Sequence, residues 1–236
     1  MEFIALEAII LVGGLGTRLK SVVPDRPKPL ADIGGAPFLY YLMTSLGRAG
    51  VRSVVLAAGY KFDLFNDFRD IELGVENVEI SVEESPLGTG GAIKKAFNLV
   101  QGSHALVLNG DSFFDVNYNE FCRFHKSLGN EISIACLKIA DVSRYGSIIY
   151  NRNVITGFSE KGKKGSGYIN GGIYLVNRSA LGCMEEGQFS FESFLSIHAP
   201  DGNFGIYKHD GYFIDIGIPE DYQRANKEIP SMIPFF

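Results

Sequence analysis

The sequence predicts an α/β fold with a mostly parallel central sheet and a second half that is richer in β-strands. Over the first half, short apolar runs alternate with helical patterns, an order typical of parallel sheets covered by helices on both faces. Over the second half, strand-like segments follow one another with few helices between them. No repeat, linker or low-complexity tract divides the 236 residues, so we expect one domain over residues 1–236, with halves at 1–115 and 116–236.

The elements of the first half follow from hydrophobic spacing. Short apolar runs predict strands at residues 8–12, 54–58, 78–82 and 105–108. Apolar residues at helical spacing predict a helix from Phe38 to Leu46, which Gly47 and Gly50 bring to an end. A second helix is expected over residues 92–100, after the glycine-rich loop ESPLGTGG.

The second half contains six strand-like segments, at residues 132–137, 147–150, 154–158, 169–176, 204–208 and 212–216. Glu192 is expected to open a short helix in the segment SFES, and Pro219 suits the first turn of a final helix over residues 220–228. The apolar ending MIPFF suits a terminus that is tucked in or faces a second subunit, so a homodimer is considered.

Composition excludes several classes of partner. The chain is 46% hydrophobic and 21% charged, ordinary values for a globular protein with a sizeable core. Its formal net charge of -5 gives no bulk attraction to nucleic acid or to an anionic membrane, so neither partner is expected. No segment has the apolar length of a membrane span, and the start of the chain lacks the features of a secretory signal. We therefore expect a cytoplasmic protein.

The cysteines support the same location. They are three in number, lie far apart and form no CxxC pair: Cys122, Cys136 and Cys183. This pattern argues against a disulfide framework or a zinc site and fits a reducing compartment. We expect all three to be small buried hydrophobic side chains.

A loop of extreme composition, LVGGLGTRLKSVVPDRPKPL, follows the first predicted strand over residues 11–30. A glycine-rich turn after a strand can cradle phosphate, because backbone N–H groups approach the oxygens where no Cβ intervenes. The P-loop pattern fails because Arg18 stands where it needs a glycine, and the dinucleotide pattern fails at Leu19. The prolines of the loop also exclude the helix and strand that a dehydrogenase would have before Asp32.

Two cations in this loop are candidate phosphate ligands. Lys28 lies between Pro27 and Pro29, and the following proline biases Lys28 toward an extended backbone. The fork of Arg18 suits phosphate oxygens, and a lysine suits a point-charge contact. Loops of this length are uncommon in compact domains unless they are functional.

Together with this loop, five further segments resemble the signature of the sugar-phosphate nucleotidyltransferases. The matching pieces are GGLGTRL and PKPL in the loop, SPLGTGGAI at 85–93, NGD at 109–111, EK at 160–161, NGGIY at 170–174 and DIGIP at 215–219. Their order along the chain makes the resemblance specific. It implies a Rossmann-like three-layer α/β/α nucleotidyltransferase fold, with a nucleotide-binding half at 1–115 and a β-rich sugar-phosphate-binding half at 116–236.

The resemblance also implies roles for individual residues. The nucleotide would be bound by Leu11, Gly13, Gly14, Gly16, Thr17, Arg18, Lys28, Gly59, Glu84, Gly88, Thr89 and Asp111. The sugar phosphate would be bound by Gly110, Tyr145, Gly146, Glu160, Lys161, Asn170, Gly171 and Glu192. The catalytic set would be Arg18, Lys28, Asp111 and Lys161, with Arg18 on the leaving pyrophosphate, Lys28 near the α-phosphate and Lys161 on the sugar phosphate.

Two aspartates are candidate metal ligands. Asp111 follows a buried strand, at the carboxyl end where α/β sheets bind ligands. Asp215 is flanked by apolar residues, and a buried carboxylate is costly unless it is paired or metal-bound. Together they could hold one Mg²⁺, which prefers carboxylate and phosphate oxygens, and the resemblance assigns them that role.

The reaction implied is attack of a sugar 1-phosphate oxygen on the α-phosphorus of a nucleoside triphosphate, which yields a nucleotide-sugar and pyrophosphate. Within the family, the short chain and the segments SPLGTGGAI and NGD most resemble the heptose 1-phosphate guanylyltransferases of surface polysaccharide biosynthesis. This resemblance favours GTP as the nucleotide. Glu83 or Glu84 could accept hydrogen bonds from guanine N1–H and its amino group. Glucose 1-phosphate thymidylyltransferases and N-acetylmuramate 1-phosphate uridylyltransferases are close alternatives. A non-catalytic, nucleotide-sugar-binding regulatory subunit is an alternative of another class.

Overall fold

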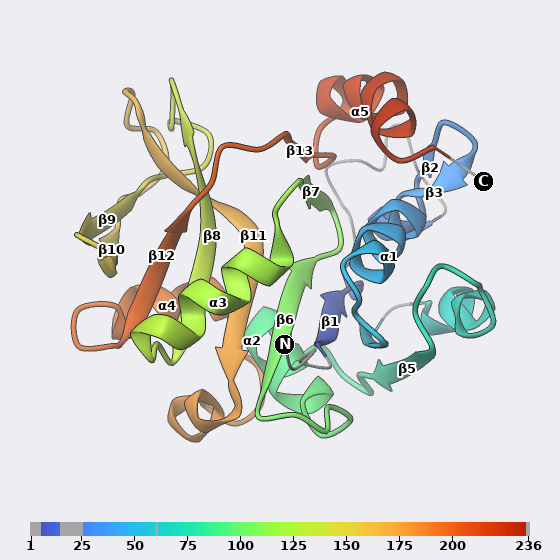
Figure 1. The fold of residues 1–236 in the computed structure, drawn as a ribbon, viewed down its shortest axis with the longest axis horizontal. Helices are drawn as coiled ribbons and strands as arrows, with labels where there is room; N and C mark the ends of the chain where they lie inside the picture. Colours follow the sequence, from blue (N-terminus) through green and yellow to red (C-terminus); the bar gives the residue numbers. More distant parts are fainter. Residues whose placement is uncertain (1–5, 15–25, 60, 235–236) are drawn as a thin grey trace.

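A nine-stranded sheet runs through both halves of the chain in the computed structural model (Figure 1), which describes residues 6–14, 26–59 and 61–234. The strand order in this sheet is β5-β4-β1-β6-β11-β8-β12-β10-β9. Helices and strands interleave along the chain, so the predicted α/β class is confirmed.

The first half forms the parallel part of the sheet. Its strands are β1 (Glu7–Leu11), β4 (Ser53–Ala58), β5 (Asn77–Val82) and β6 (His104–Asn109). Their connections include α1 (Phe38–Arg48), the 3-10 helix η3 (Phe62–Arg69) and α2 (Gly88–Ala96). The predicted second helix therefore begins earlier than expected, inside the glycine-rich segment.

The second half forms a mixed extension. Its strands are β8 (Ile132–Ile139), β9 (Ile148–Asn151), β10 (Val154–Phe158), β11 (Gly167–Asn177) and β12 (Phe204–Lys208). Four pairs of the whole sheet are parallel, namely β1–β4, β1–β6, β4–β5 and β8–β12. The pairs β6–β11, β8–β11, β10–β12 and β9–β10 are antiparallel. The predicted parallel arrangement is therefore confirmed in the first half. The second half has few helices between its strands because antiparallel neighbours need no crossover helix.

The remaining helices are α3 (Tyr118–Leu128), the 3-10 helix η4 (Arg178–Cys183), α4 (Phe191–His198) and α5 (Pro219–Met232). The helix α3 was not predicted. It begins at Asn117, whose side chain accepts from the backbone N–H of Glu120, and ends at Gly129 in a left-handed conformation. The last helix begins at Pro219 as expected but continues beyond residue 228.

The core has two layers because side chains alternate across each strand. Ile10 of β1 joins the cluster that includes residues of α1, α3 and α5, whereas the adjacent Ile9 joins the cluster that includes α2 and α4. Cys122 and Cys136 are buried as predicted, but Cys183 is exposed at the end of η4. None of the described helices combines the length and apolar character needed to cross a membrane.

The described residues also form two short sheets, of which the second carries site residues. β2 (Asp32–Ile33) pairs with β3 (Ala36–Pro37) before α1. β7 (Ser112–Phe114) pairs antiparallel with β13 (Phe213–Asp215), two strands that are far apart in sequence. The predicted strand at 212–216 therefore exists, but it joins β7 rather than the large sheet.

Candidate active site

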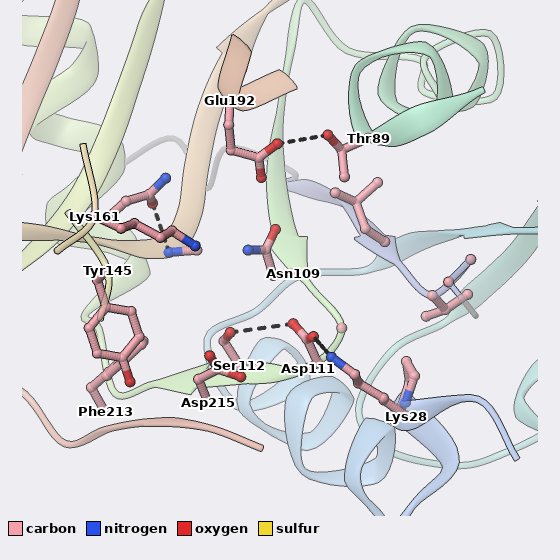
Figure 2. Close-up of a pocket in the computed structure, with 18 residues that line it drawn as sticks. Lys28, Thr89, Asn109, Asp111, Ser112, Tyr145, Lys161, Glu192, Phe213 and Asp215 are labelled. Carbon is pink, nitrogen blue, oxygen red and sulfur yellow. Dashed lines mark hydrogen bonds and ion pairs between the residues drawn. The ribbon is translucent and has the colours of Figure 1, made fainter. Parts of the chain in front are cut away.

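A cavity of about 420 Å³ opens beyond the carboxyl ends of β1 and β6 (Figure 2). This position is where α/β sheets bind ligands. From the predicted nucleotide set, its walls include Leu11, Gly13, Gly14, Lys28, Thr89 and Asp111. From the predicted sugar-phosphate set, they include Gly110, Tyr145, Lys161, Asn170 and Glu192. The two sets therefore meet in one cavity.

The chain leaves β1 along the neighbouring strand β4. The backbone N–H groups of Val12 and Gly13 both donate to the carbonyl of Ala57, at 2.9 and 3.0 Å. A Cβ on Gly13 would lie 2.9 Å from the backbone nitrogen of Gly59, whereas one on Gly14 would meet nothing within 4 Å. Gly13 is thus required by packing, and Gly14 presents bare backbone to the cavity. Gly16, Thr17 and Arg18 lie outside the described residues.

Lys28 enters the cavity from a short 3-10 helix, η2 (Lys28–Leu30). The preceding Pro27 has the extended backbone, and its carbonyl accepts from the N–H of Leu30 at 2.9 Å. The predicted extended conformation of Lys28 is therefore wrong, because this turn and the burial of Leu30 outweigh the bias from the following proline. Lys28 Nζ lies 2.8 Å from Asp111 Oδ2, and the lysine side chain is only 14% exposed.

The β7–β13 ladder brings the two predicted metal ligands together. Ser112 pairs with Asp215, and the backbone N–H of Ile216 donates to the carbonyl of Asp111 at 3.0 Å. Asp215 accepts from the N–H of Gly217 at 2.7 Å and lies 3.3 Å from the guanidinium of Arg144. Burial raises the pKa of the Asp215 carboxyl, and the negative charge of Asp111 raises it further. The positive charges of Arg144 and Lys28 act in the opposite direction and partly compensate the two carboxylates.

Asp111 and Asp215 are suited to a magnesium ion whose other ligands come from water and from substrate phosphates. Mg²⁺ is commonly held by one or two carboxylates together with water and substrate phosphates. Within the described residues, no group of three or more His, Cys, Asp or Glu side chains is arranged to hold a metal. Asp111 and Asp215 could therefore contribute the protein ligands, and phosphate oxygens the others.

A second cavity of about 380 Å³ adjoins the first. The two share five residues: Asn109, Tyr145, Lys161, Asn170 and Glu192. The second cavity also takes in Gly146 and Glu160 from the predicted sugar-phosphate set. Gly146 has φ +77°, and a Cβ there would lie 2.5 Å from the carbonyl oxygen of Ser159, so only glycine fits this approach.

Lys161 stands at the boundary of the two cavities and points into the site (Figure 2). It lies on the loop between β10 and β11, which is tied to the connection between β8 and β9 by the N–H of Gly162 donating to the carbonyl of Ser143 at 2.7 Å. Among the described residues, no carboxylate forms an ion pair with Lys161. Its ammonium group is therefore free to meet a phosphate.

Nearly the whole chain matches one family. Residues 7–231 match the family model described as nucleotidyl transferase. The chain belongs to the nucleotidyl transferase family.

Particular members of the nucleotidyl transferase family are similar over almost their full length. The chain is 40% identical over 230 residues to D-glycero-α-D-manno-heptose 1-phosphate guanylyltransferase of Aneurinibacillus thermoaerophilus, covering 97% of this chain and 100% of that protein. It is 41% identical over 221 residues to the Campylobacter jejuni protein of the same name, covering 92% and 97%. HddC from Yersinia pseudotuberculosis superposes with a TM-score of 0.84 at 40% identity, covering 94% of this chain and 99% of that chain. A second structure of HddC is complexed with GMP-PN.

The charges of this nucleotidyl transferase suit phosphoryl chemistry. Lys28 and Lys161 approach the cavity from opposite sides, with Asp111 and Asp215 beside Lys28 (Figure 2). Transfer at phosphorus depends on positioning and on neutralising charge rather than on a protein nucleophile. The arrangement therefore places positively charged groups where they could meet two phosphate-bearing ligands.

Some predicted residues of this nucleotidyl transferase are not on the cavity walls. Gly171 lies in an irregularity of β11, where a Cβ would lie 2.4 Å from the ring of Phe114. Its neighbour Gly172 lines the cavity instead. Gly88 has φ +66°, and a Cβ there would lie 2.4 Å from the carbonyl oxygen of Phe189, so its glycine is explained by packing.

Of the two glutamates that could accept hydrogen bonds from guanine, Glu83 lies beside Gly13, where a Cβ would be 3.1 Å from its Oε1. Gly59 lies there too, close to the side chain of Glu83. Glu83 is half-buried, and its Oε2 accepts from the N–H of Leu87 at 2.9 Å, so this glutamate holds the loop in place. Glu84 is exposed and makes no hydrogen bond to another described residue.

Sequence reasoning did not assign six of the wall residues: Val12, Pro29, Asn109, Ser112, Gly172 and Phe213. Asn109 begins the quoted segment NGD, so its position at the end of a predicted strand was an available signal. Ser112 and Phe213 reach the site through the β7–β13 pairing, which joins strands far apart in sequence and leaves no local signal.

Proposed function

We propose that the protein transfers GMP from GTP to D-glycero-α-D-manno-heptose 1-phosphate and releases pyrophosphate. The observation that carries this proposal is the cluster of Lys28, Asp111 and Asp215 facing Lys161 across one cavity. The choice of GTP and heptose is supported by the 40% and 41% identity to proteins of that name. The GDP-heptose formed would serve surface polysaccharide biosynthesis, in capsule or lipopolysaccharide.

Each residue is assigned a role in the transfer according to its position in the site. Lys161 orients the sugar phosphate so that its oxygen faces the α-phosphorus in line with the leaving pyrophosphate. Lys28 neutralises charge at the α-phosphate, and Arg18 with the backbone of residues 13–17 holds the pyrophosphate. Mg²⁺ held by Asp111 and Asp215 would supply further positive charge to the phosphate oxygens.

The guanine base is assigned to the loop between β5 and α2. Glu83 has one carboxylate oxygen committed to Leu87, whereas Glu84 is exposed and can accept from both guanine N1–H and the amino group. A site built to hydrogen-bond a substrate rejects analogues that lack the donors. We therefore propose Glu84 as the residue that disfavours dTTP and UTP.

The test is pyrophosphate release across a grid of GTP, dTTP and UTP against heptose, glucose and N-acetylmuramate 1-phosphates. The proposal expects the highest kcat/KM for GTP with the heptose. A maximum at dTTP with glucose 1-phosphate, or at UTP with the muramate, would replace the substrates and leave the reaction class intact. No release with any pair would favour the regulatory subunit and contradict the enzyme assignment.

Location and assembly are part of the proposal. We propose a cytoplasmic enzyme, where nucleoside triphosphates are available, and a homodimer. The edge strand β9 carries Ile149, which is 52% exposed, and is a candidate contact between subunits. Analytical ultracentrifugation of the wild type and of the Ile149→Lys variant tests the homodimer, and a monomeric wild type would contradict it.

A further inference from the structure

The first turns of α2 and α4 face each other beside the active-site cavity. Although these helices are far apart in sequence, the N–H of Gly90 donates to the carbonyl of Phe189 at 3.0 Å. The N–H of Phe189 in turn donates to the carbonyl of Leu87, also at 3.0 Å. The two helix starts are therefore held in register, one on the nucleotide side and one on the sugar side.

Thr89 joins these two helix starts through its hydroxyl. Thr89 Oγ1 accepts from the N–H of Phe191 at 2.8 Å and donates to Glu192 Oε2 at 2.9 Å (Figure 2). A hydroxyl has a single proton to donate. Because that proton is directed to Glu192, Thr89 cannot also donate to phosphate oxygens, although its motif resembles a nucleotide-binding segment.

Glu192 is fixed through one oxygen and open at the other. Its Oε2 also accepts from Ser190 Oγ at 2.9 Å, and Ser190 caps α4 by accepting from the N–H of Ser193 at 3.2 Å. No described residue donates to Oε1 of Glu192, and the side chain lines both cavities. A carboxylate repels phosphate but accepts from hydroxyl groups, so Oε1 suits the polyhydroxyl part of a ligand.

We propose that Thr89 is a positioning residue for sugar binding, which acts by orienting the carboxylate of Glu192. The inference rests on the proposed function, since it takes the second ligand to be a sugar 1-phosphate. Thr89 thus belongs by sequence to the nucleotide segment but acts on the other substrate. It also links the two sites mechanically, because any shift of the first turn of α2 moves the hydrogen-bond donor to Glu192.

The test compares Thr89→Val, which removes the hydroxyl at nearly constant volume, with Thr89→Ser, which keeps it. Losing a hydrogen bond to a charged group predicts that Thr89→Val raises KM for the sugar 1-phosphate by about tenfold and leaves KM for GTP within about twofold. Thr89→Ser should retain both values. Thr44→Val, an equivalent change in α1 away from the cavities, is the matched control and should leave both KM values unchanged.

A double-mutant cycle separates orientation of Glu192 from a general packing effect. If Thr89 acts through the carboxylate, Thr89→Val should raise the sugar KM in the wild type but not further in a Glu192→Ala background. Calorimetric titration of the sugar 1-phosphate, with a GTP analogue bound whose α–β bridge is a non-cleavable methylene group, should show the same pattern in Kd.

Several results would overturn the inference. A rise in KM for GTP alone would place the Thr89 hydroxyl on the nucleotide, and a lower Tm with both KM values unchanged would make it a structural link only. Full additivity with Glu192→Ala would also contradict the role. An inactive parent enzyme would contradict the proposed function itself, whereas an active parent with an unaffected Thr89→Val variant would contradict only the role of Thr89.

Discussion

At the scale of single residues, the Lys28–Asp111 pair shows how one contact serves two purposes. The ammonium group is 14% exposed and lies 2.8 Å from the carboxylate, so each charge compensates the other before a ligand arrives. The same ammonium is on the cavity wall, where it can meet phosphate oxygens. A residue of this kind is expected to matter more to turnover than to folding.

Lys28→Met tests that expectation by removing the charge while keeping most of the side-chain volume. The variant should lower kcat/KM by roughly 10²–10³, the scale for losing one preorganised charge-stabilising group. Steady-state pyrophosphate release measures it, with Lys163→Met, a lysine outside both cavities, as the control. A Tm far below that of the parent would instead reassign Lys28 to structure.

Asp111→Asn and Asp215→Asn test the metal assignment. Each removes one charged oxygen ligand from the pair, so each should abolish magnesium-dependent turnover. Manganese binding followed by electron paramagnetic resonance provides a readout that does not depend on activity, and both variants should bind Mn²⁺ more weakly than the parent. Full turnover of the parent in excess chelator would contradict the assignment.

Thr44 provides a stability prediction away from the site. Its hydroxyl is buried in α1 and has no hydrogen-bond partner among the described residues. Thr44→Val should stabilise the fold by about 1 kcal/mol, because it removes an unsatisfied polar group at constant shape. Calorimetry should show a rise in Tm of about 2–4 °C for a chain of this size. An unchanged or lower Tm would mean that the hydroxyl has a partner in solution.

At the scale of elements, α3 is attached to the sheet by a polar contact as well as by packing. His125 of α3 is buried, with Nδ1 2.8 Å from Ser133 Oγ of β8 and Nε2 3.1 Å from Asn177 Oδ1 at the end of β11. Burial lowers the pKa of His125, despite the opposing effects of the Asn177 hydrogen bond and the Glu131 charge. Burial therefore favours the neutral form of this imidazole in the native protein.

This lowered pKa predicts acid sensitivity of the fold. Below about pH 6.5, the ordinary histidine pKa, His125 binds a proton more readily in the unfolded chain than in the native state. The free energy of unfolding is therefore largest above that pH and decreases as the pH falls. The Tm of the wild type should fall between pH 7.5 and 5.5. His125→Gln should show a shallower dependence on pH, and an equal slope in both proteins would exclude His125 as the cause.

At the scale of the whole molecule, the two halves share a sheet and a helix. β6 of the first half pairs with β11 of the second, and β7 pairs with β13. The final helix α5 returns to the first half, where Tyr222 Oη donates to the carbonyl of Asp32 at 2.7 Å and the N–H of Gly34 donates to Asn226 Oδ1 at 3.0 Å. Without the second half, β6 and β7 would each lose a hydrogen-bonded neighbour, and without the first half β11 and β13 would lose theirs.

This shared architecture predicts that the halves unfold together. Urea unfolding followed by far-UV circular dichroism and by tyrosine fluorescence should give coincident transitions, as expected for one cooperative unit. Two resolved transitions would show that residues 1–115 and 116–236 are separate folding units and would contradict the single-domain prediction.

The sequence by itself determined the four long strands of the first half and the family, and it predicted a phosphate-binding loop after β1 whose residues 15–25 lie outside the described ones. These features are local: a strand is readable from consecutive apolar residues, and phosphate-binding loops from the order of Gly, Pro, Lys and Arg. The segments GGLGTRL, PKPL and NGD therefore suffice to predict Gly13, Lys28 and Asp111 as site residues, and all three line the cavity.

Only the tertiary structure decided how the pieces meet. The placement of Asp215 beside Asp111 depends on the β7–β13 ladder, and the choice of Gly172 over Gly171 on the cavity depends on an irregularity in β11. The link from Thr89 to Glu192 likewise depends on two helix starts that lie far apart in the sequence. Contacts of this kind are formed by the packing of whole elements, so no stretch of neighbouring residues contains the information that specifies them.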